Sequence, residues 1–365
     1  MIITGVDLTA VRVNHRGDWV FVFVNTDEGL RGLGELRAGR NYAGRIRATK
    51  ALAEWLRGRD PRRIREFLNR FARTGCDRDT FGAVSALEQA LWDILGKSLD
   101  VPVYTLLGGP VRDDVRLYAN INRASEDRSP ENFASLAARA VGEGFDAVKL
   151  APFDEMHRDI DSAADAVPGI ARVQAVRRAV GSDVDLLVDC HSRFTVRGAL
   201  ETAAALRELD VYWFEQPVSE AQLNAVVEVN RRCGLQTAGG EGRVTGSEFR
   251  EVLENAAMDV IMPDVTVVGG IANLKSIAEM AETFGVPTAP HGPFGPVAVS
   301  AGMHVMVTHP GFMILEYGWG EIKWRRELTL SSEEIVNGRI RPGRRPGLGV
   351  ELNPDVLKAH AVTLN

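Results

Sequence analysis

Cysteine is scarce in this sequence: only Cys76, Cys190 and Cys233 occur among 365 residues. Because the three are odd in number and widely separated, they predict no disulfide framework and are typical of a reducing compartment. Long hydrophobic runs are also missing, since no segment approaches the roughly 18 consecutive apolar residues that a membrane-spanning helix requires. The chain starts without basic residues and reaches an acid at Asp7, which is not typical of a signal peptide. We therefore expect a cytoplasmic protein that does not bind membranes.

An excess of positive charge is absent as well. Lys and Arg number 43 and Asp and Glu number 49, which gives a formal net charge of −6. A nucleic-acid-binding surface needs a basic face, so this balance argues against a nucleic-acid partner. The composition is otherwise ordinary for a folded globular protein, with 45% hydrophobic and 25% charged residues. A length of 365 residues fits two domains, or one large barrel with an appendage.

The first part of the chain, residues 1–112, predicts a domain in which strands are followed by helices. The run Trp19–Val24 is rich in aromatic and β-branched residues, Thr26–Gly29 supplies a turn, and Leu30–Glu35 forms a return strand. From Tyr42 to Lys97 apolar residues recur with the three- and four-residue spacing of a helix. This segment is therefore predicted to be an α+β domain that begins with an antiparallel meander.

From residue 113 to residue 330, short apolar runs alternate with amphipathic stretches. Eight runs are candidate strands: Val115–Asn120, Asp146–Leu150, Asp185–Asp189, Val211–Glu215, Gln236–Glu241, Asp259–Pro263, Pro287–Pro290 and Phe312–Glu316. Strands that alternate with helices imply a parallel sheet, and eight such units predict an α/β fold of the (β/α)₈ barrel type. A doubly wound open sheet is the alternative that the periodicity leaves open. Residues 331–365 predict a return of the chain to the first domain.

Three of the candidate strands lead to a carboxylate. Asp189, Glu215 and Glu241 each follow an apolar run, and each is separated from the next by 26 residues. Because the strands of a barrel end at the same mouth, we expect these side chains to converge there, although acids also begin loops and cap helices for purely structural reasons. Converging carboxylates repel one another, and a hard divalent cation removes that cost. The spacing therefore predicts a Mg²⁺ site, whereas Zn²⁺ is less suited to a group without thiol or imidazole.

The other strand ends supply histidines, further acids and a lysine. Asp264 and His291 follow the next two runs, where the carboxylate is expected to fix the tautomer of the imidazole and raise its basicity. Glu316 ends the eighth run. His191 lies two residues beyond the first carboxylate and is a candidate acid or base on another side of the mouth. Lys149, in the second strand, places a cation at the rim.

A metal ion, two histidines on different strands and a lysine together predict abstraction of a proton next to a carboxylate. The enediolate that results carries two negative charges, which a metal ion and neighbouring cations stabilise as they develop. A neutral histidine is the expected base. Two alternatives of other classes stay open, namely a Schiff-base aldolase that uses Lys149 and a barrel without catalytic activity.

Four segments, spread over nearly the whole chain, resemble the motifs of one enzyme family. They are Asn25–Glu35, Ala86–Lys97, Leu106–Gly109 and Phe214–Pro217. The family is the enolase superfamily, and the resemblance is to its mandelate-racemase-like branch. It implies an α+β capping domain formed by the N-terminal segment 1–112 together with the C-terminal tail 331–365, and an enolase-type β/α barrel over residues 113–330. It also implies a homo-oligomer.

The same resemblance implies roles for individual residues. The magnesium ligands that it implies are Asp189, Glu215 and Glu241. Asp264 and His291 match the catalytic dyad of the branch, and Glu316 matches an acid that hydrogen-bonds the substrate near its carboxylate. Many members carry a second basic lysine two residues after the first, but this chain has Ala151 two residues after Lys149. Racemisation through a lysine–histidine pair is therefore not expected.

Within this branch the sequence is most similar to acid-sugar dehydratases, such as those that act on galactonate and mannonate. Asp189–His191 resembles their Asp-x-His motif, and Pro290–Pro296 is similar to the segment around their base. The histidine of the first motif is implied to protonate the departing hydroxyl group. The resemblance therefore predicts a Mg²⁺-dependent hydro-lyase that converts an aldonate-type sugar acid to a 2-keto-3-deoxy acid. A racemase, epimerase or cycloisomerase that uses His291 and His191 as two bases is the alternative.

The polyol chain of the sugar acid needs contacts of its own near the barrel mouth. The residues expected to make them are Asn120, Asn122, Phe153, Arg193 and Trp319. The loops 14–18 and 37–42 of the cap are expected to lie over the substrate.

Overall fold

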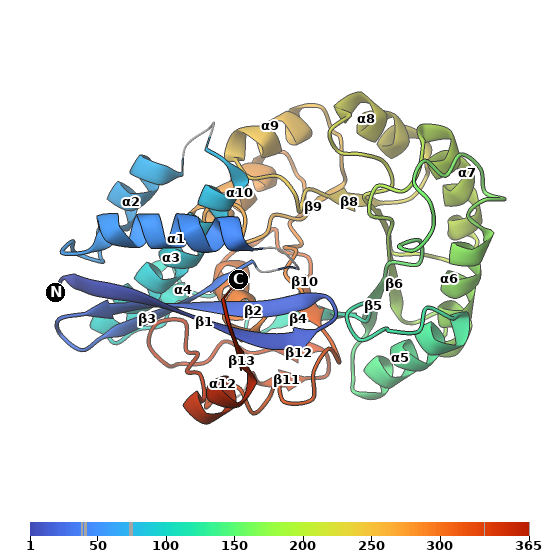
Figure 1. Cartoon of the computed structure of the whole chain (residues 1–365). Helices are drawn as coiled ribbons and strands as arrows, with labels where there is room; N and C mark the ends of the chain where they lie inside the picture. Colours follow the sequence, from blue (N-terminus) through green and yellow to red (C-terminus); the bar gives the residue numbers. More distant parts are fainter. Residues whose placement is uncertain (38, 40–41, 73–75, 332, 365) are drawn as a thin grey trace.

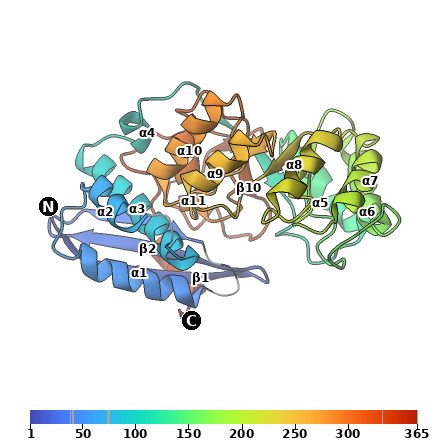
Figure 2. The same cartoon turned by 90° about the horizontal axis from the view of Figure 1, so that it is seen from above.

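The computed structural model describes residues 1–37, 39, 42–72, 76–331 and 333–364. Figure 1 shows a ring of parallel strands surrounded by helices, and beside it a layer of antiparallel strands covered by helices. We call the antiparallel layer with its helices the cap, and the ring with its helices the barrel. Seen after a turn of 90°, the cap lies to one side of the barrel (Figure 2).

Three long strands and one short strand form the sheet of the cap. They are β1 (Ile3–Asn14), β2 (Gly17–Thr26), β3 (Arg31–Leu36) and β13 (Ala361–Val362), in the order β13-β1-β2-β3, with every neighbour antiparallel. The sheet contains the meander that the sequence predicts. Ala10 of β1 pairs with Val362 of β13, so the end of the chain joins the sheet with which the chain begins.

Three helices form the second layer of the cap: α1 (Ala43–Leu56), α2 (Ile64–Phe71) and α3 (Arg78–Ser98). The first and the third pack on the sheet, and α2 packs against α3. The longest of them, α3, begins where the side chain of Asp77 accepts a hydrogen bond from the backbone amide of Thr80. It lies directly on β3, and Gly34 makes that approach possible. A Cβ atom at Gly34 would lie 1.9 Å from the carbonyl oxygen of Ala86 in α3, so any other residue would push the helix away.

Seven parallel strands form most of the barrel. They are β4 (Val115–Asn120), β5 (Ala147–Leu150), β6 (Asp185–Asp189), β7 (Trp213–Glu215), β8 (Thr237–Gly239), β9 (Val260–Ile261) and β10 (Leu315–Gly318). The first six are neighbours in chain order, and β10 pairs in parallel with β4. This last pairing, together with the bridges described next, closes the ring. It makes the doubly wound open sheet wrong, because an open sheet keeps two edge strands that do not meet.

The seventh expected strand, Pro287–Pro290, is much shorter than predicted. Only Thr288 pairs there, in parallel bridges to Ile261 on one side and to Phe312 on the other. The prolines explain the difference, because a proline has no amide hydrogen to donate to a ladder of strands. These two bridges nevertheless link β9 with the segment that leads into β10.

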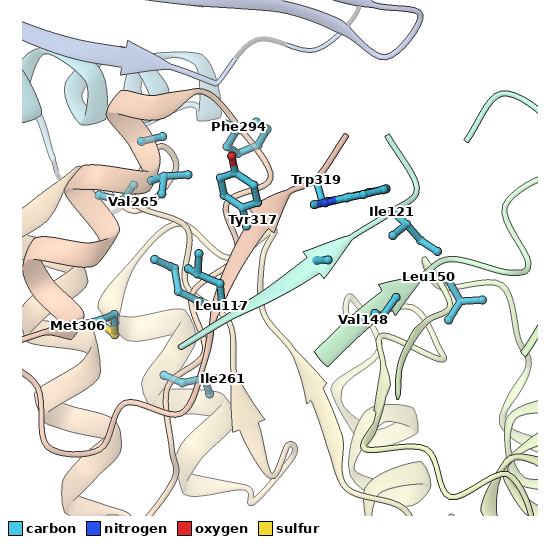
Figure 3. Packing of buried hydrophobic residues seen from close by; sticks show 14 of the residues in the cluster. Leu117, Ile121, Val148, Leu150, Ile261, Val265, Phe294, Met306, Tyr317 and Trp319 are labelled. Atoms are coloured by element: carbon cyan, nitrogen blue, oxygen red, sulfur yellow. The ribbon is translucent and has the colours of Figure 1, made fainter. Parts of the chain in front are cut away.

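Seven helices follow the strands of the barrel: α5 (Pro130–Gly142), α6 (Val167–Val180), α7 (Val196–Arg207), α8 (Leu223–Arg232), α9 (Gly246–Glu254), α10 (Ile271–Thr283) and α11 (Pro296–Met306). The main core lies between these helices and the strands, where Leu117 of β4 and Ile261 of β9 lie in one cluster with Met306 of α11 (Figure 3). A second cluster includes Tyr118 and Trp213, whose rings meet edge to face with centroids 5.4 Å apart. Because neighbouring side chains of a strand point to opposite faces, this second cluster fills the inside of the ring.

Four short elements complete the chain: α4 (Val103–Leu106), β11 (Ile335–Val336), β12 (Arg339–Ile340) and α12 (Pro354–His360). The first of them links the cap to the barrel, and the other three belong to the C-terminal part of the chain. None of the helices in the described part of the chain combines the length and the apolar character that crossing a bilayer demands.

Two buried carboxylates of the cap accept hydrogen bonds from backbone amides in the first turns of two barrel helices. Glu35 of β3 accepts hydrogen bonds from the backbone amides of Gly295 and Ala298, at 2.6 and 3.0 Å, where α11 begins. Glu88 of α3 accepts two backbone amides at the start of α10, at 2.7 and 2.9 Å. Amides at a helix N-terminus lack partners inside the helix and favour a negative charge, so these contacts fix the cap relative to the barrel mouth.

Candidate active site

Three carboxylates lie at the ends of neighbouring strands of the barrel. Asp189 ends β6 and Glu215 ends β7, and the two residues are partners in the register of these strands. Glu241 follows two residues after the end of β8, the next strand of the ring. The first two side chains are buried, and that of Glu241 is 18% exposed. Burial, with the neighbouring charge of Asp189, raises the pKa of Glu215 to about 8.

Each of these carboxylates is paired with a different cationic side chain. Glu215 contacts Lys149, Asp189 contacts His191, and Glu241 contacts His291. Within the described part of the chain, no three or more acidic, histidine or cysteine side chains form a ready cage for a metal ion. The donor set itself fits a hard cation, because it supplies carboxylate oxygens from adjacent strand ends that already attract positive charge.

Lys149, in β5, lies at the centre of the acidic side chains. Its Nζ is 3.1 Å from Oε1 of Glu215, 2.7 Å from Oε1 of Glu316 and 4.0 Å from Oδ2 of Asp189. Burial opposes the charge on the amine, but Glu215 and Glu316 outweigh it and raise the pKa of Lys149 well above its usual value. A Schiff base requires a neutral amine, so this environment disfavours the aldolase alternative.

His291 and Asp264 form the dyad that the sequence predicts to lie on neighbouring strand ends. Nδ1 of His291 lies 2.8 Å from Oδ2 of Asp264, and Nε2 of the same ring lies 2.7 Å from Oε2 of Glu241. The other oxygen of Asp264 accepts hydrogen bonds from the amide and the hydroxyl of Thr266, at 2.7 and 2.6 Å. The aspartate is therefore held on both sides, and the ring has a fixed orientation. Burial opposes protonation, but Glu241 and Glu316 raise the pKa of His291 to about 10.

His191 approaches the row of carboxylates from the opposite end to His291. Its backbone has a positive φ of 45°, which is uncommon for a residue with a side chain and typical of functional sites. Nε2 lies 2.9 Å from Oδ2 of Asp189, and Nδ1 contacts the carboxylate of Asp154. Although burial opposes it, Asp189 and Asp154 raise the pKa of His191 well above its usual value.

Asp154 is a site residue that reasoning from the sequence misses. It lies in the loop after β5, and Nη2 of Arg16, from the hairpin between β1 and β2, is 3.3 Å from its Oδ2. Burial opposes its charge, but His191 and the nearby arginines lower the pKa of Asp154 to about 2. No spacing rule distinguishes Asp154 from the other acids of its loop, so only the folded chain reveals the contact.

Glu316 and two asparagines lie on the side of Lys149. Glu316 is fully buried and accepts hydrogen bonds from Nδ2 of Asn120 at 2.7 Å and from the amide of Gly292 at 3.0 Å. The side chain of Asn122 accepts the amide of Ala151 at 2.6 Å. Asn120 therefore belongs to the cluster, whereas Asn122 holds the backbone around it.

Three of the residues expected to contact the polyol chain have other partners. Arg193 donates to two carbonyl groups of its neighbouring loop, one of them that of Met156 at 3.0 Å. The indole nitrogen of Trp319 donates to Glu143 at 2.9 Å, and Phe153 is buried in the core. These contacts do not bring the three side chains to the carboxylates, and a role in substrate binding stays a prediction for them.

The cap contributes an arginine to the site. Nη2 of Arg37 lies 3.6 Å from Oε1 of Glu241, and its Nη1 lies 3.6 Å from Oδ2 of Asp264. Arg37 begins the loop 37–42 that was expected over the substrate, and residues 38, 40 and 41 of that loop lie outside the described residues. The sequence predicted the loop but not this contact, because the arginine is far from the barrel along the chain.

Comparisons with known proteins agree with this arrangement. The sequence model of the family described as enolase C-terminal domain-like matches residues 132–356, and that of the mandelate racemase / muconate lactonizing enzyme N-terminal domain matches residues 6–108. The chain is 36% identical over 360 residues to a D-galactonate dehydratase of Ralstonia nicotianae, with 95% of this chain and 91% of that protein covered. It is 32% identical over 372 residues to a D-xylonate dehydratase of Haloferax volcanii, with 99% and 89% covered.

Solved structures show the same fold. A mandelate racemase/muconate lactonizing enzyme-like protein from Rubrobacter xylanophilus superposes with a TM-score of 0.91 at 33% identity, over 99% of this chain and 98% of that chain. A member of the enolase superfamily from Salmonella Typhimurium superposes with a TM-score of 0.91 at 27% identity, over 100% and 99% of the two chains. Both comparisons include the cap as well as the barrel, because they cover nearly the whole length.

Proposed function

The chain belongs to the enolase superfamily, and from that premise we propose that it is a dehydratase of sugar acids. The reaction removes the C2 proton of an aldonate-type acid and eliminates the C3 hydroxyl group to give a 2-keto-3-deoxy acid. The observation that supports it best is the pair of histidines at the two ends of the carboxylate row. His291 is oriented by Asp264, and His191 is oriented by Asp154. The names of the relatives, which act on D-galactonate and D-xylonate, support the same class of substrate.

Magnesium is the metal ion that we propose for this site. Asp189, Glu215 and Glu241 would hold it, since their oxygens lie at adjacent strand ends. When bound, Mg²⁺ stabilises the negative charge that develops on the carboxylate of the substrate as the C2 proton leaves. Lys149 and Glu316 lie next to this row, where they are placed to bind the same carboxylate group.

We assign the removal of the C2 proton to His291 and the protonation of the leaving C3 hydroxyl group to His191. Asp264 contacts Nδ1 of His291, so Nε2, which contacts Glu241, is the atom left to take the C2 proton. This role needs a neutral ring, and a cation held by Glu241 would offset the negative charge that raises the pKa of His291. His191 donates a proton to the C3 oxygen, which leaves as water, and the electron pair of the broken C2–H bond forms the C2–C3 double bond. The enol then tautomerises to the 2-keto acid. Electrons and atoms balance without any oxidant or reductant.

A second candidate function uses the same geometry. If His191 acts as a base rather than as an acid, the two histidines could exchange a proton on opposite faces of a carbon, which describes a racemase, an epimerase or a cycloisomerase. The names of the relatives, which are dehydratases, favour the acid role for His191. The contacts do not separate the two roles, because Asp154 on His191 and Asp264 on His291 are equivalent carboxylate partners. A cytoplasmic location and a homo-oligomeric state stay predictions.

The test is a screen of aldonic and aldaric acids with the purified protein and MgCl₂. A 2-keto acid detected with semicarbazide supports the dehydratase, whereas a change of configuration without loss of water supports the second candidate. The variants His291→Asn and His191→Asn should each lose activity on the acid that reacts. His157→Asn, at an exposed histidine of the loop after β5, is the matched control. Absence of a 2-keto acid from every member of the set would contradict the proposal.

A further inference from the structure

A cavity of about 440 Å³ lies between the cap and the mouth of the barrel, beside Glu241. Four arginines line it, and Glu241 is the sole acidic side chain in its lining within the described residues. From this cavity we infer that the substrate carries a second negatively charged group at the end far from the reacting carboxylate. The preferred substrate is then a dicarboxylic sugar acid, an aldaric acid. This inference rests on the proposed reaction, and it replaces the aldonate-type substrate of that proposal and of the relatives' names by an aldaric acid.

The arginines reach the cavity from four separate parts of the fold. Arg37 follows β3, Arg45 lies in α1, Arg78 begins α3, and Arg123 follows β4. Bringing like charges together from separate elements costs free energy unless a negative group offsets it. The cap supplies three of the four, so the positive charge accumulates on the wall that faces the barrel mouth.

Three of the four arginines have acidic partners, but one of their donors has none. Arg37 contacts Glu241 and Asp264, Arg45 contacts Asp79 at 3.6 Å, and Arg123 contacts Glu321. Nη2 of Arg123 is buried and has no hydrogen-bond partner among the described residues. The guanidinium group of Arg78 lies at the exposed rim of the cavity. A buried donor without a partner is costly, so Nη2 of Arg123 points to a ligand with acceptor oxygens, and Arg78 adds positive charge beside it.

Glycines make room for these side chains. A Cβ atom at Gly82 of α3 would lie 3.1 Å from Cδ and 3.2 Å from Nε of Arg45. Because Gly82 has no side chain, the side chain of Arg45 can lie close against the surface of α3. A Cβ atom at Gly242 would lie 3.8 Å from Nη1 of Arg78, which shows that this guanidinium reaches the residue next to Glu241. Arg37 and Arg78 therefore lie next to Glu241, one of the proposed metal ligands.

The reacting end and the cavity are chemically distinct. Lys149, Glu316 and Asn120 surround the place expected for the reacting carboxylate, and none of them lines the cavity. A guanidinium group binds a carboxylate through two parallel hydrogen bonds, which gives both affinity and orientation. The arginines therefore suit a terminal carboxylate, whereas an aldonate ends in a neutral hydroxyl group that gains nothing from their charge.

The experiment measures binding by calorimetry, with MgCl₂ present, for pairs of acids that share one configuration. Each pair consists of an aldaric acid and the corresponding aldonic acid, and the aldonic acid with a terminal phosphate is added for comparison. We expect the aldaric acid of the best-binding pair to bind at least about tenfold more tightly than its aldonic partner, as charge-assisted bidentate pairing implies. Because binding is measured directly, the result decides the inference even if no acid is dehydrated.

The variant Arg78→Met tests the cavity itself. It should remove most of the preference for the aldaric acid and leave the affinity for the aldonic acid unchanged. Arg231→Met, at an exposed arginine at the far end of α8, is the matched control and should keep the preference. Equal affinities within every pair, no binding by any acid, or an unchanged preference in Arg78→Met would overturn the inference. If the aldonic acid with a terminal phosphate bound more tightly than the aldaric acid, the inference of a second carboxylate would also be overturned, because the cavity would then be a phosphate site.

Discussion

His191 contacts the carboxylate of Asp154 through Nδ1, while Nε2 of the same ring lies 2.9 Å from Oδ2 of Asp189. One histidine thus joins a loop of the barrel to the end of β6. Arg16 of the cap contacts Asp154 from the other side, at 3.3 Å. The orientation of the proposed acid therefore depends on the cap as well as on the barrel.

The substitution Asp154→Asn tests this arrangement. We expect it to slow dehydration by about 10- to 100-fold, the usual effect of losing a partner that orients a functional histidine. Exchange of the C2 proton with solvent deuterium should continue, because His291 is untouched. Asp159→Asn, in the same loop and exposed, serves as the control. Equal losses of exchange and elimination would contradict a role confined to His191.

Magnesium should stabilise the folded protein through the three carboxylates. A cation that binds only the folded state at 100 times its dissociation constant adds about 2.7 kcal/mol to the free energy of unfolding. Thermal unfolding with and without MgCl₂ should therefore show a higher Tm with the metal, and Glu215→Gln should reduce the increase. Glu208→Gln, an exposed acid after α7, should keep it. An equal increase in Glu215→Gln would remove Glu215 from the proposed ligands.

The contacts between cap and barrel should contribute measurably to stability. Glu88 accepts two backbone amides of α10 and the indole nitrogen of Trp92 at 2.7 Å. Glu88→Gln leaves at least one of these buried donors without its acceptor, so the free energy of unfolding should fall by about 2 kcal/mol. Denaturant titration measures this loss. Glu54→Gln, an exposed acid of α1, should change it by less than about 0.5 kcal/mol.

A buried histidine in α11 should make stability depend on pH. Burial lowers the pKa of His304 to about 4 from an ordinary value of 6.5. Below about pH 6.5 the histidine therefore binds a proton in the unfolded chain but not in the folded chain. The contribution of the neutral ring to the free energy of unfolding is fully present above pH 6.5 and is lost as the pH falls toward 4. At one pKa unit per 1.36 kcal/mol, the loss is about 3 kcal/mol.

Denaturant titrations between pH 8 and pH 4.5 check this dependence. The wild-type protein should lose stability over that range more steeply than His304→Gln, which carries no titrating ring. His360→Gln, at a histidine of α12 outside the core, should keep the wild-type slope. The same slope in His304→Gln would show that other groups cause the loss.

Much of the fold and part of the site could be predicted from the sequence. The first four apolar runs end where β4 to β7 end, and side chains that follow such runs converge at one mouth, which is why the positions of Asp189, Glu215 and His291 could be foreseen. The contacts of Asp154 and Arg37 could not, since both residues lie in loops whose paths depend on tertiary packing. Trp319 follows a strand in the same way, yet its indole packs toward Glu143.

The central claim is that His291 takes the C2 proton and His191 releases the C3 hydroxyl group. The most direct test follows both events in D₂O with the best substrate, by detecting deuterium at C2 of recovered substrate and the 2-keto acid product. The account predicts that His191→Asn still exchanges the C2 proton but forms little product, and that His291→Asn does neither. Dehydration at the wild-type rate by either variant would contradict it.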